Sequence, residues 1–209
     1  MSDPFVTKNI LKWYDLNKRS LPWRKNVSKE KRQYNTLISE FMLQQTQVAT
    51  VIPYFNKFVK EIPNIKKLAS VDNKKLIKLW EGLGYYSRAR NLKKAAQSVI
   101  KNFNGVIPDN FDDLKSLSGI GDYTANAILA IAFNKPYIPL DGNVERIIKR
   151  YLYLKKEKEI QKENLIEKKS ILGFSNRSSD YAQALMEFGA LVCKPTNPMC
   201  CQCPITKKC

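Results

Sequence analysis

The sequence contains no histidine among its 209 residues. This absence excludes Ser–His and Cys–His catalysis, together with every metal site that uses a histidine ligand. Acid–base chemistry near neutral pH must therefore rely on carboxylate, Lys, Tyr or Cys side chains. No apolar run approaches the roughly 20 residues of a membrane span, and the first residues lack the charged-then-apolar layout of a signal peptide. These absences predict a soluble cytoplasmic protein that makes no membrane contact.

Acidic residues are scarce relative to basic ones. The chain has 19 Asp and Glu against 36 Lys and Arg, which gives a formal net charge of +17. A field of this sign attracts polyanions and makes their binding strongly dependent on salt. Anionic lipid is the other polyanion to consider, but we find no basic amphipathic segment whose apolar face is free of core packing. The charge therefore favours a nucleic-acid partner.

Alternating strand patterns of convincing length are also missing, whereas helical spacing of apolar residues recurs along the chain. The class predicted is all-α. A mixed charge run at 155–170 is interpreted as a solvated helix face rather than a basic binding surface, because both signs alternate. The helices are expected at 37–52, 92–103, 111–117, 123–133, 144–154 and 180–192. Pro53 would end the first of them, and Ser87 would be the N-cap of the second.

Four of the five cysteines form a C-x6-C-x2-C-x5-C run near the end of the sequence: Cys193, Cys200, Cys203 and Cys209. Extracellular disulfides would require export, which nothing in the sequence indicates. Four thiolates suit zinc and suit a [4Fe–4S] cluster equally well. The run therefore predicts a metal site whose metal the ligands alone leave open. Cys201 falls outside the spacing and is interpreted as a spare thiol.

This cysteine spacing, at the end of an all-helical basic chain, resembles the cluster loop of the endonuclease III and MutY glycosylases. The resemblance implies a [4Fe–4S] cluster rather than zinc, in a mainly structural role. It also implies a two-lobed helix-hairpin-helix fold. One lobe of six helices, carrying the hairpin, is expected at 29–143, and a second helical lobe at 1–28 and 144–209, ending in the cluster loop.

The segment 117–125 places Gly119 and Gly121 in a turn between two predicted helices. It is either an ordinary tight turn or a site where a phosphate approaches the backbone amides at a helix N-terminus. It resembles the helix-hairpin-helix motif, which contacts the DNA backbone without reading sequence. Downstream, Asp141 is a candidate N-cap of the helix that starts near Val144. The resemblance makes Asp141 the catalytic aspartate as well, with Asn143 as its helper.

Glu40 lies among apolar residues in the segment 39–48, SEFMLQQTQV. A carboxyl group in apolar surroundings has a raised pKa and can act as a general acid, whereas an exposed glutamate on an amphipathic helix would have no such role. The segment closely resembles the MutY signature, in which this glutamate protonates the leaving adenine at N7. In endonuclease III, a lysine attacks the sugar from the position two residues after the second hairpin glycine. That position holds Tyr123, which cannot form a Schiff base, so lyase activity is not expected.

The resemblance extends to residues that would contact DNA or the extruded base. Gln45 corresponds to a wedge into the base stack and Gln44 to a contact with the opposite base. On the glycine-flexed loop 82–90, Tyr85 corresponds to an intercalator beside the phosphate-holding Arg88. The remaining residues of this set are two pocket elements and the hairpin glycines: Trp23 and Arg24, Gln183, Gly119 and Gly121.

Together these features predict a monomeric, monofunctional glycosylase that flips a mispaired adenine out of double-stranded DNA and leaves an abasic site. The adenine would lie opposite 8-oxoguanine or guanine. The sequence ends at Cys209, so the 8-oxoguanine-recognition domain that usually follows in MutY proteins is absent from it. Two alternatives stay open: a thymine or uracil mismatch glycosylase of the same superfamily, since Tyr123 suits that branch too, and a DNA-binding protein without activity.

Overall fold

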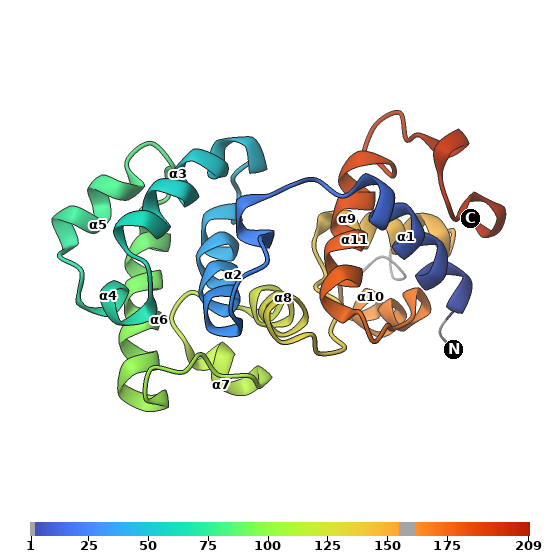
Figure 1. Cartoon of the computed structure of the whole chain (residues 1–209). Helices are drawn as coiled ribbons and strands as arrows, with labels where there is room; N and C mark the ends of the chain where they lie inside the picture. The colour runs from blue at the N-terminus through green and yellow to red at the C-terminus, as the bar shows by residue number, and fades with distance from the viewer. Residues whose placement is uncertain (1–2, 155–161) are drawn as a thin grey trace. The chain divides into compact units, whose positions relative to one another are not determined.

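The structure, a computed structural model, describes residues 3–154 and 162–209. Over these residues it contains α-helices and short 3-10 helices and no β-strand, which confirms the all-α prediction. The chain divides into two compact units (Figure 1). The central unit is Ser20–Phe133, and the terminal unit combines Met1–Arg19 with Asn134–Cys209. The mixed charge run expected at 155–170 lies partly outside the described residues, and α10 (Lys162–Lys168) covers part of it.

The central unit is organised around α2, which is buried without interruption from Gln33 to Met42. Such a helix is enclosed on all sides, and α2 indeed contacts α3, α6, α8 and η1. The elements of this unit are η1 (Pro22–Arg24), α2 (Lys29–Leu43), α3 (Val48–Glu61), α4 (Ile65–Ser70), α5 (Asn73–Trp80), α6 (Ser87–Phe103), α7 (Phe111–Ser116) and α8 (Asp122–Phe133).

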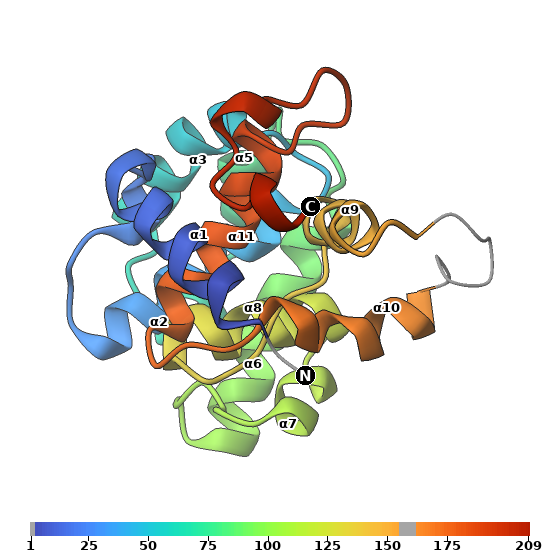
Figure 2. The ribbon, with the colours of Figure 1, turned by 90° about the vertical axis from the view of Figure 1, so that its right-hand side faces the viewer.

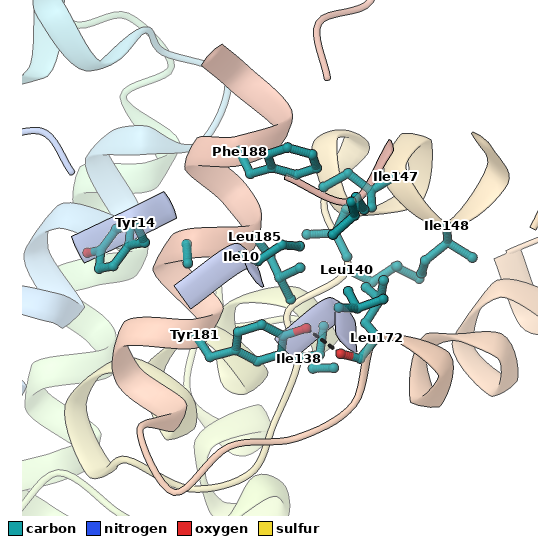
Figure 3. Close-up of a cluster of buried hydrophobic side chains, with 14 of the residues drawn as sticks. Ile10, Tyr14, Ile138, Leu140, Ile147, Ile148, Leu172, Tyr181, Leu185 and Phe188 are labelled. Carbon is teal, nitrogen blue, oxygen red and sulfur yellow. Dashed lines mark hydrogen bonds between the residues drawn. The ribbon is translucent and has the colours of Figure 1, made fainter. Parts of the chain in front are cut away.

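The terminal unit packs α1 (Pro4–Asn17) against α11 (Ser178–Leu191), and the two lie side by side in Figures 1 and 2. Helix α9 (Gly142–Tyr151) packs against α11 and against η3 (Lys169–Leu172). Figure 3 shows the shared apolar core, where Leu185 and Phe188 meet residues of α1 and α9. Within it, the Tyr181 hydroxyl donates to the carbonyl of Leu172, so the buried phenol keeps a hydrogen-bond partner. Two short 3-10 helices, η4 (Cys200–Gln202) and η5 (Thr206–Lys208), are directly followed by Cys203 and Cys209.

Side-chain caps set where many of the helices begin. In each case an Asp, Asn or Ser oxygen accepts from a backbone amide of the first turn, which satisfies a donor that the helix itself cannot. The capping residues are Asp3, Ser28, Asn64, Asp72, Asn110 and Asp141.

The observed units differ in their bounds from the lobes expected at 29–143 and at 1–28 with 144–209. Trp23 packs edge-on against Phe55 of α3, with ring centroids 5.3 Å apart, so the segment before 29 already belongs to the central unit. At the other end, Ile138 and Leu140 are buried in the terminal core. The central unit also has seven α-helices, α2 to α8, rather than six. Short helices such as α4 show too few turns for a clear periodicity.

The single helix expected at 37–52 and ended by Pro53 is wrong. The chain instead leaves α2 at Leu43 and begins α3 at Val48, and Pro53 lies inside α3. The break coincides with Gln45, whose φ of 55° no right-handed helix can contain. Pro53 has no amide to donate to the carbonyl of Ala49, one turn earlier in α3. Ala49 is exposed, so water can donate to that carbonyl instead, and the proline is tolerated.

None of the helices in the described residues is both long and apolar enough to cross a membrane.

Candidate active site

The hairpin joins α7 to α8 through the turn that contains Gly119 and Gly121. Gly119 has a φ of 81°, and a Cβ placed there would lie 2.8 Å from the Cβ of Asn91 and 2.9 Å from Cε1 of Phe41. A side chain is therefore excluded by packing as well as by backbone conformation. At Gly121 a Cβ would meet nothing within 4 Å, so this position is open to an approaching group. The two glycines thus serve different purposes, and only Gly121 has the free space that a phosphate contact would use.

Glu40 lies on α2 and is only 5% exposed. Its neighbours in the chain, Ser39 and Phe41, are at most 1% exposed, so Glu40 is not an exposed glutamate on an amphipathic helix. Tyr123, in the first turn of α8, is half-buried. Glu40 is therefore enclosed by the protein. The apolar character of its surroundings and its role as an acid stay predictions.

Asp141 is the N-cap of α9, and its two carboxylate oxygens have different partners. Oδ1 accepts from the backbone amide of Val144 at 2.8 Å, and Oδ2 accepts from Nδ2 of Asn143 at 2.9 Å. The capping interpretation is therefore correct, and it leaves the catalytic one in place because the amides of the α9 N-terminus favour negative charge at this oxygen pair.

Within the terminal unit, a chain of hydrogen bonds continues from Asn143 to α11 and the residues just after it. Oδ1 of Asn143 accepts from Nη2 of Arg146 at 2.8 Å, and that guanidinium also donates to the carbonyls of Gly189, at 2.7 Å, and Cys193, at 2.8 Å. Asn143 is thus fixed on both sides, and its amide can only donate toward Asp141. Neither Arg146 nor Gly189 was anticipated from the sequence. A Cβ on Gly189 would lie 2.5 Å from the Cβ of Asn143, so this glycine is what lets α9 and α11 approach.

The residues expected to contact DNA have two kinds of environment. Gln45 is exposed with a φ of 55°, and Tyr85 is 62% exposed with a φ of 48°. Both are non-glycine residues in the left-handed region, which marks local strain and points to function. Gln44 is half-buried, and its Nε2 lies 3.4 Å from the Gly119 carbonyl and from the Thr124 hydroxyl. The chain thus exposes two strained tips, and the residue before Gln45 contacts the hairpin turn.

Three other expected contact residues take part in packing. Trp23 is 8% exposed and Arg24 is half-buried in η1. Gln183 is 7% exposed, and its amide donates to the Ser179 carbonyl, one turn back in α11, at 2.9 Å. Their roles toward an extruded base stay predictions.

The cysteine run lies in the terminal unit after α11. Burial raises the pKa of Cys203 against a hydrogen bond with the Ile205 backbone that lowers it, and the neighbouring Cys209, Cys193 and Cys200 add to the rise. Burial, followed by Cys193 and Cys200, raises the pKa of Cys209 in the same way. Cys203 and Cys209 therefore lie within electrostatic reach of each other and of Cys193 and Cys200, and Cys201 is not among the groups involved.

We find in residues 3–154 and 162–209 no three Cys, Asp or Glu side chains that converge closely enough to hold an ion as they stand. The donor set nevertheless fits a metal centre. As thiolates, the four cysteines would repel one another unless they shared a cation, and Nη1 of Arg150 lies 3.4 Å from Sγ of Cys193. Arg150 also donates to the carbonyls of Lys194 and Pro195, which holds the first ligand segment in place.

The sequence profile of the HhH-GPD superfamily base excision DNA repair protein family matches residues 38–172. The chain belongs to the HhH-GPD superfamily. The matched segment contains Glu40, the hairpin and Asp141, whereas Trp23, Gln183 and the four cysteines lie outside it.

Curated relatives of this HhH-GPD protein include the adenine DNA glycosylase of Buchnera aphidicola subsp. Acyrthosiphon pisum (strain APS), which is 43% identical over 100% of this chain and 59% of its own length. The adenine DNA glycosylase of Homo sapiens is 40% identical over 96% of this chain and 38% of its own length. The chain thus spans about half the length of the curated relatives it matches.

Solved structures support the same fold. A thermostable thymine-DNA glycosylase superimposes with a TM-score of 0.84 at 27% identity, covering 97% of this chain and 93% of that one. A non-covalent endonuclease III–DNA complex gives a TM-score of 0.77 at 23% identity, covering 98% of this chain and 92% of that one, which shows the fold alone.

Proposed function

We propose that this HhH-GPD protein is a monofunctional DNA glycosylase that binds double-stranded DNA as a monomer and removes mispaired adenine. The observation that carries the proposal is Glu40, a carboxyl group that is 5% exposed on α2. Burying a carboxyl group costs free energy, so the burial of Glu40 in the core around α2 indicates a functional role. The curated relatives at 40–43% identity are named adenine DNA glycosylases, which supports adenine as the base.

In the proposed reaction, adenine opposite 8-oxoguanine or guanine leaves the base stack, which costs least where pairing is already faulty. Glu40 gives its proton to the base, the bond between the sugar and the base breaks, and Asp141 stabilises the cationic sugar. Water adds to the sugar and releases a proton, which restores the Glu40 carboxyl group, and the products are free adenine and an abasic site. Tyr123 cannot form a Schiff base, so the strand is not cut. Such a substrate places the protein with chromosomal DNA. In a bacterium this is the nucleoid, which lies in the cytosol.

The closest competing function is excision of thymine from T·G mismatches, which the thymine-DNA glycosylase fold match favours. One assay separates the two. The chain is incubated with an A·8-oxoguanine duplex and with a T·G duplex, and free base is measured in both. We expect adenine release and little thymine release. The reverse result would establish the competing function, and duplex binding without release of either base would indicate a DNA-binding protein without activity.

We further propose that Cys193, Cys200, Cys203 and Cys209 hold a [4Fe–4S] cluster. When bound, the cluster crosslinks the loop after α11 and supplies no step of base removal. Zinc is the alternative occupant.

The cluster predicts a visible colour that depends on specific cysteines. Purified protein should be yellow-brown, with absorbance near the blue edge of the visible spectrum. The Cys203→Ser variant should lose most of that absorbance and bind less iron, because a ligand is removed, while Cys201→Ser should keep both. A colourless protein that contains zinc, or equal loss in the two variants, would contradict the assignment.

A further inference from the structure

Arg88, in the first turn of α6, is 7% exposed although it carries a charge. None of its hydrogen bonds in the described residues goes to a carboxylate. Nη1 donates to the carbonyls of Phe41, at 3.3 Å, and Met42, at 2.9 Å, and to that of Gln44. Nη2 donates to the carbonyls of Leu83, at 3.0 Å, and Gly84, at 3.2 Å. One guanidinium therefore joins the end of α2 to the loop that precedes α6.

Each of the two segments that Arg88 joins leads directly to one of the two strained tips, Gln45 or Tyr85. Gln44 directly precedes Gln45, and Gly84 directly precedes Tyr85, and both following residues have positive φ. A non-glycine residue keeps this conformation only where its surroundings hold it there. Arg88 binds the carbonyl immediately before each of them, so it acts at the peptide units that set the direction of each tip.

The energetic setting of Arg88 shows why a guanidinium is needed. Burial lowers its pKa, so the fold carries a desolvation cost at this position. Several contacts offset the cost. The C-terminal end of α2 carries partial negative charge, and its last turn contains no basic residue. The charge of Arg88 is therefore favourable at that helix end. The rings of Trp80 and Tyr85 lie 5.7 and 5.4 Å from its central carbon. A lysine has a single nitrogen and cannot span two segments with a rigid fork.

We infer that Arg88 is a positioning residue that holds Gln45 and Tyr85 in one fixed arrangement, so that both side chains enter a DNA duplex together. This inference rests on the proposed function, because it gives the two tips a shared task in base extrusion. It replaces the expected phosphate contact of Arg88, since its Nη groups point inward to carbonyls. The phosphates would then be met by other basic residues.

The test measures extrusion separately from base release. An A·8-oxoguanine duplex carries 2-aminopurine beside the target adenine, and its fluorescence reports unstacking. For Arg88→Lys we expect duplex binding to persist but extrusion to slow by roughly 10²-fold, the scale of a misplacement of about 1 Å. Arg32→Lys, the same change at an exposed position of α2, is the matched control and should behave as wild type. Extrusion by Arg88→Lys at the wild-type rate would overturn the inference.

A double-mutant cycle separates positioning from a merely structural role. Tyr85→Ala should slow extrusion strongly in the wild-type background and little in the Arg88→Lys background, because the tip is already misplaced there. Equal losses in both backgrounds would contradict the inference.

Should Arg88→Lys not fold, Gly84→Ala tests the same segment, since a φ of 73° disfavours alanine while its Cβ would meet nothing within 4 Å. Extrusion without adenine release in wild type would refute the proposed function and leave this inference standing.

Discussion

Replacing Glu40 with glutamine is expected to reduce single-turnover adenine release by about 10²–10⁴-fold, the usual worth of a general acid. Glutamine has the same size and fits the buried site on α2, where Glu40 is 5% exposed. It cannot, however, supply the proton that turns adenine into a leaving group. The measurement is the rate of adenine release from an A·8-oxoguanine duplex with enzyme in excess. Duplex affinity should change little, because the substitution acts on the bond-breaking step.

The matched control for Glu40 is Glu61→Gln on α3, where the carboxylate pairs with Lys75 at 2.9 Å on the surface. An exposed pair of this kind contributes little to stability, so its loss should leave the rate of release unchanged. A duplex whose leaving base departs without protonation should narrow the difference between wild type and Glu40→Gln. Full activity of Glu40→Gln on adenine would remove the general acid from the mechanism.

The features that could be predicted from the sequence are those with local causes. The N-cap at Asp141 needs only the amide of Val144, three residues away. The enclosed position of Glu40 follows from its apolar neighbours along the chain, and the hairpin from two glycines between short helical patterns. Where the cause was backbone conformation, prediction failed: Gln45, not Pro53, separates α2 from α3.

The features that could not be predicted depend on contacts between distant parts of the chain. Arg88 sits 46 residues from Met42, whose carbonyl it binds, and a sequence pattern cannot distinguish that arrangement from an exposed arginine. Arg146 reaches Gly189 across 43 residues. The spacing of Arg146 after Asn143 on one helix was the available signal, because residues three apart share a face. Its partner Gly189 lies on α11, and this contact depends on how α9 and α11 pack, which no local pattern in the sequence shows.

Asp141→Asn is expected to slow adenine release by about 10²–10³-fold, the scale of removing one electrostatic contact to the transition state. Asparagine is as good an N-cap as aspartate, so Val144 keeps its partner and α9 should stay folded. The second oxygen becomes an amide that faces Nδ2 of Asn143, which places donor against donor. Asn143 cannot turn to accept, because its Oδ1 is held by Arg146 at 2.8 Å. A lowered melting temperature should therefore accompany the loss of rate.

Combining Asp141→Asn with Asn143→Asp separates the two effects. In that double variant, the amide at 141 donates to a carboxylate at 143, which also accepts from Arg146 and forms an ion pair with it. The melting temperature should recover most of the loss, while adenine release should stay low, because the negative charge has moved by two residues along α9. Recovery of both would mean that Asp141 acts by holding the helix start, and the cationic sugar would need another stabilising group. Recovery of stability alone would assign Asp141 to the chemistry.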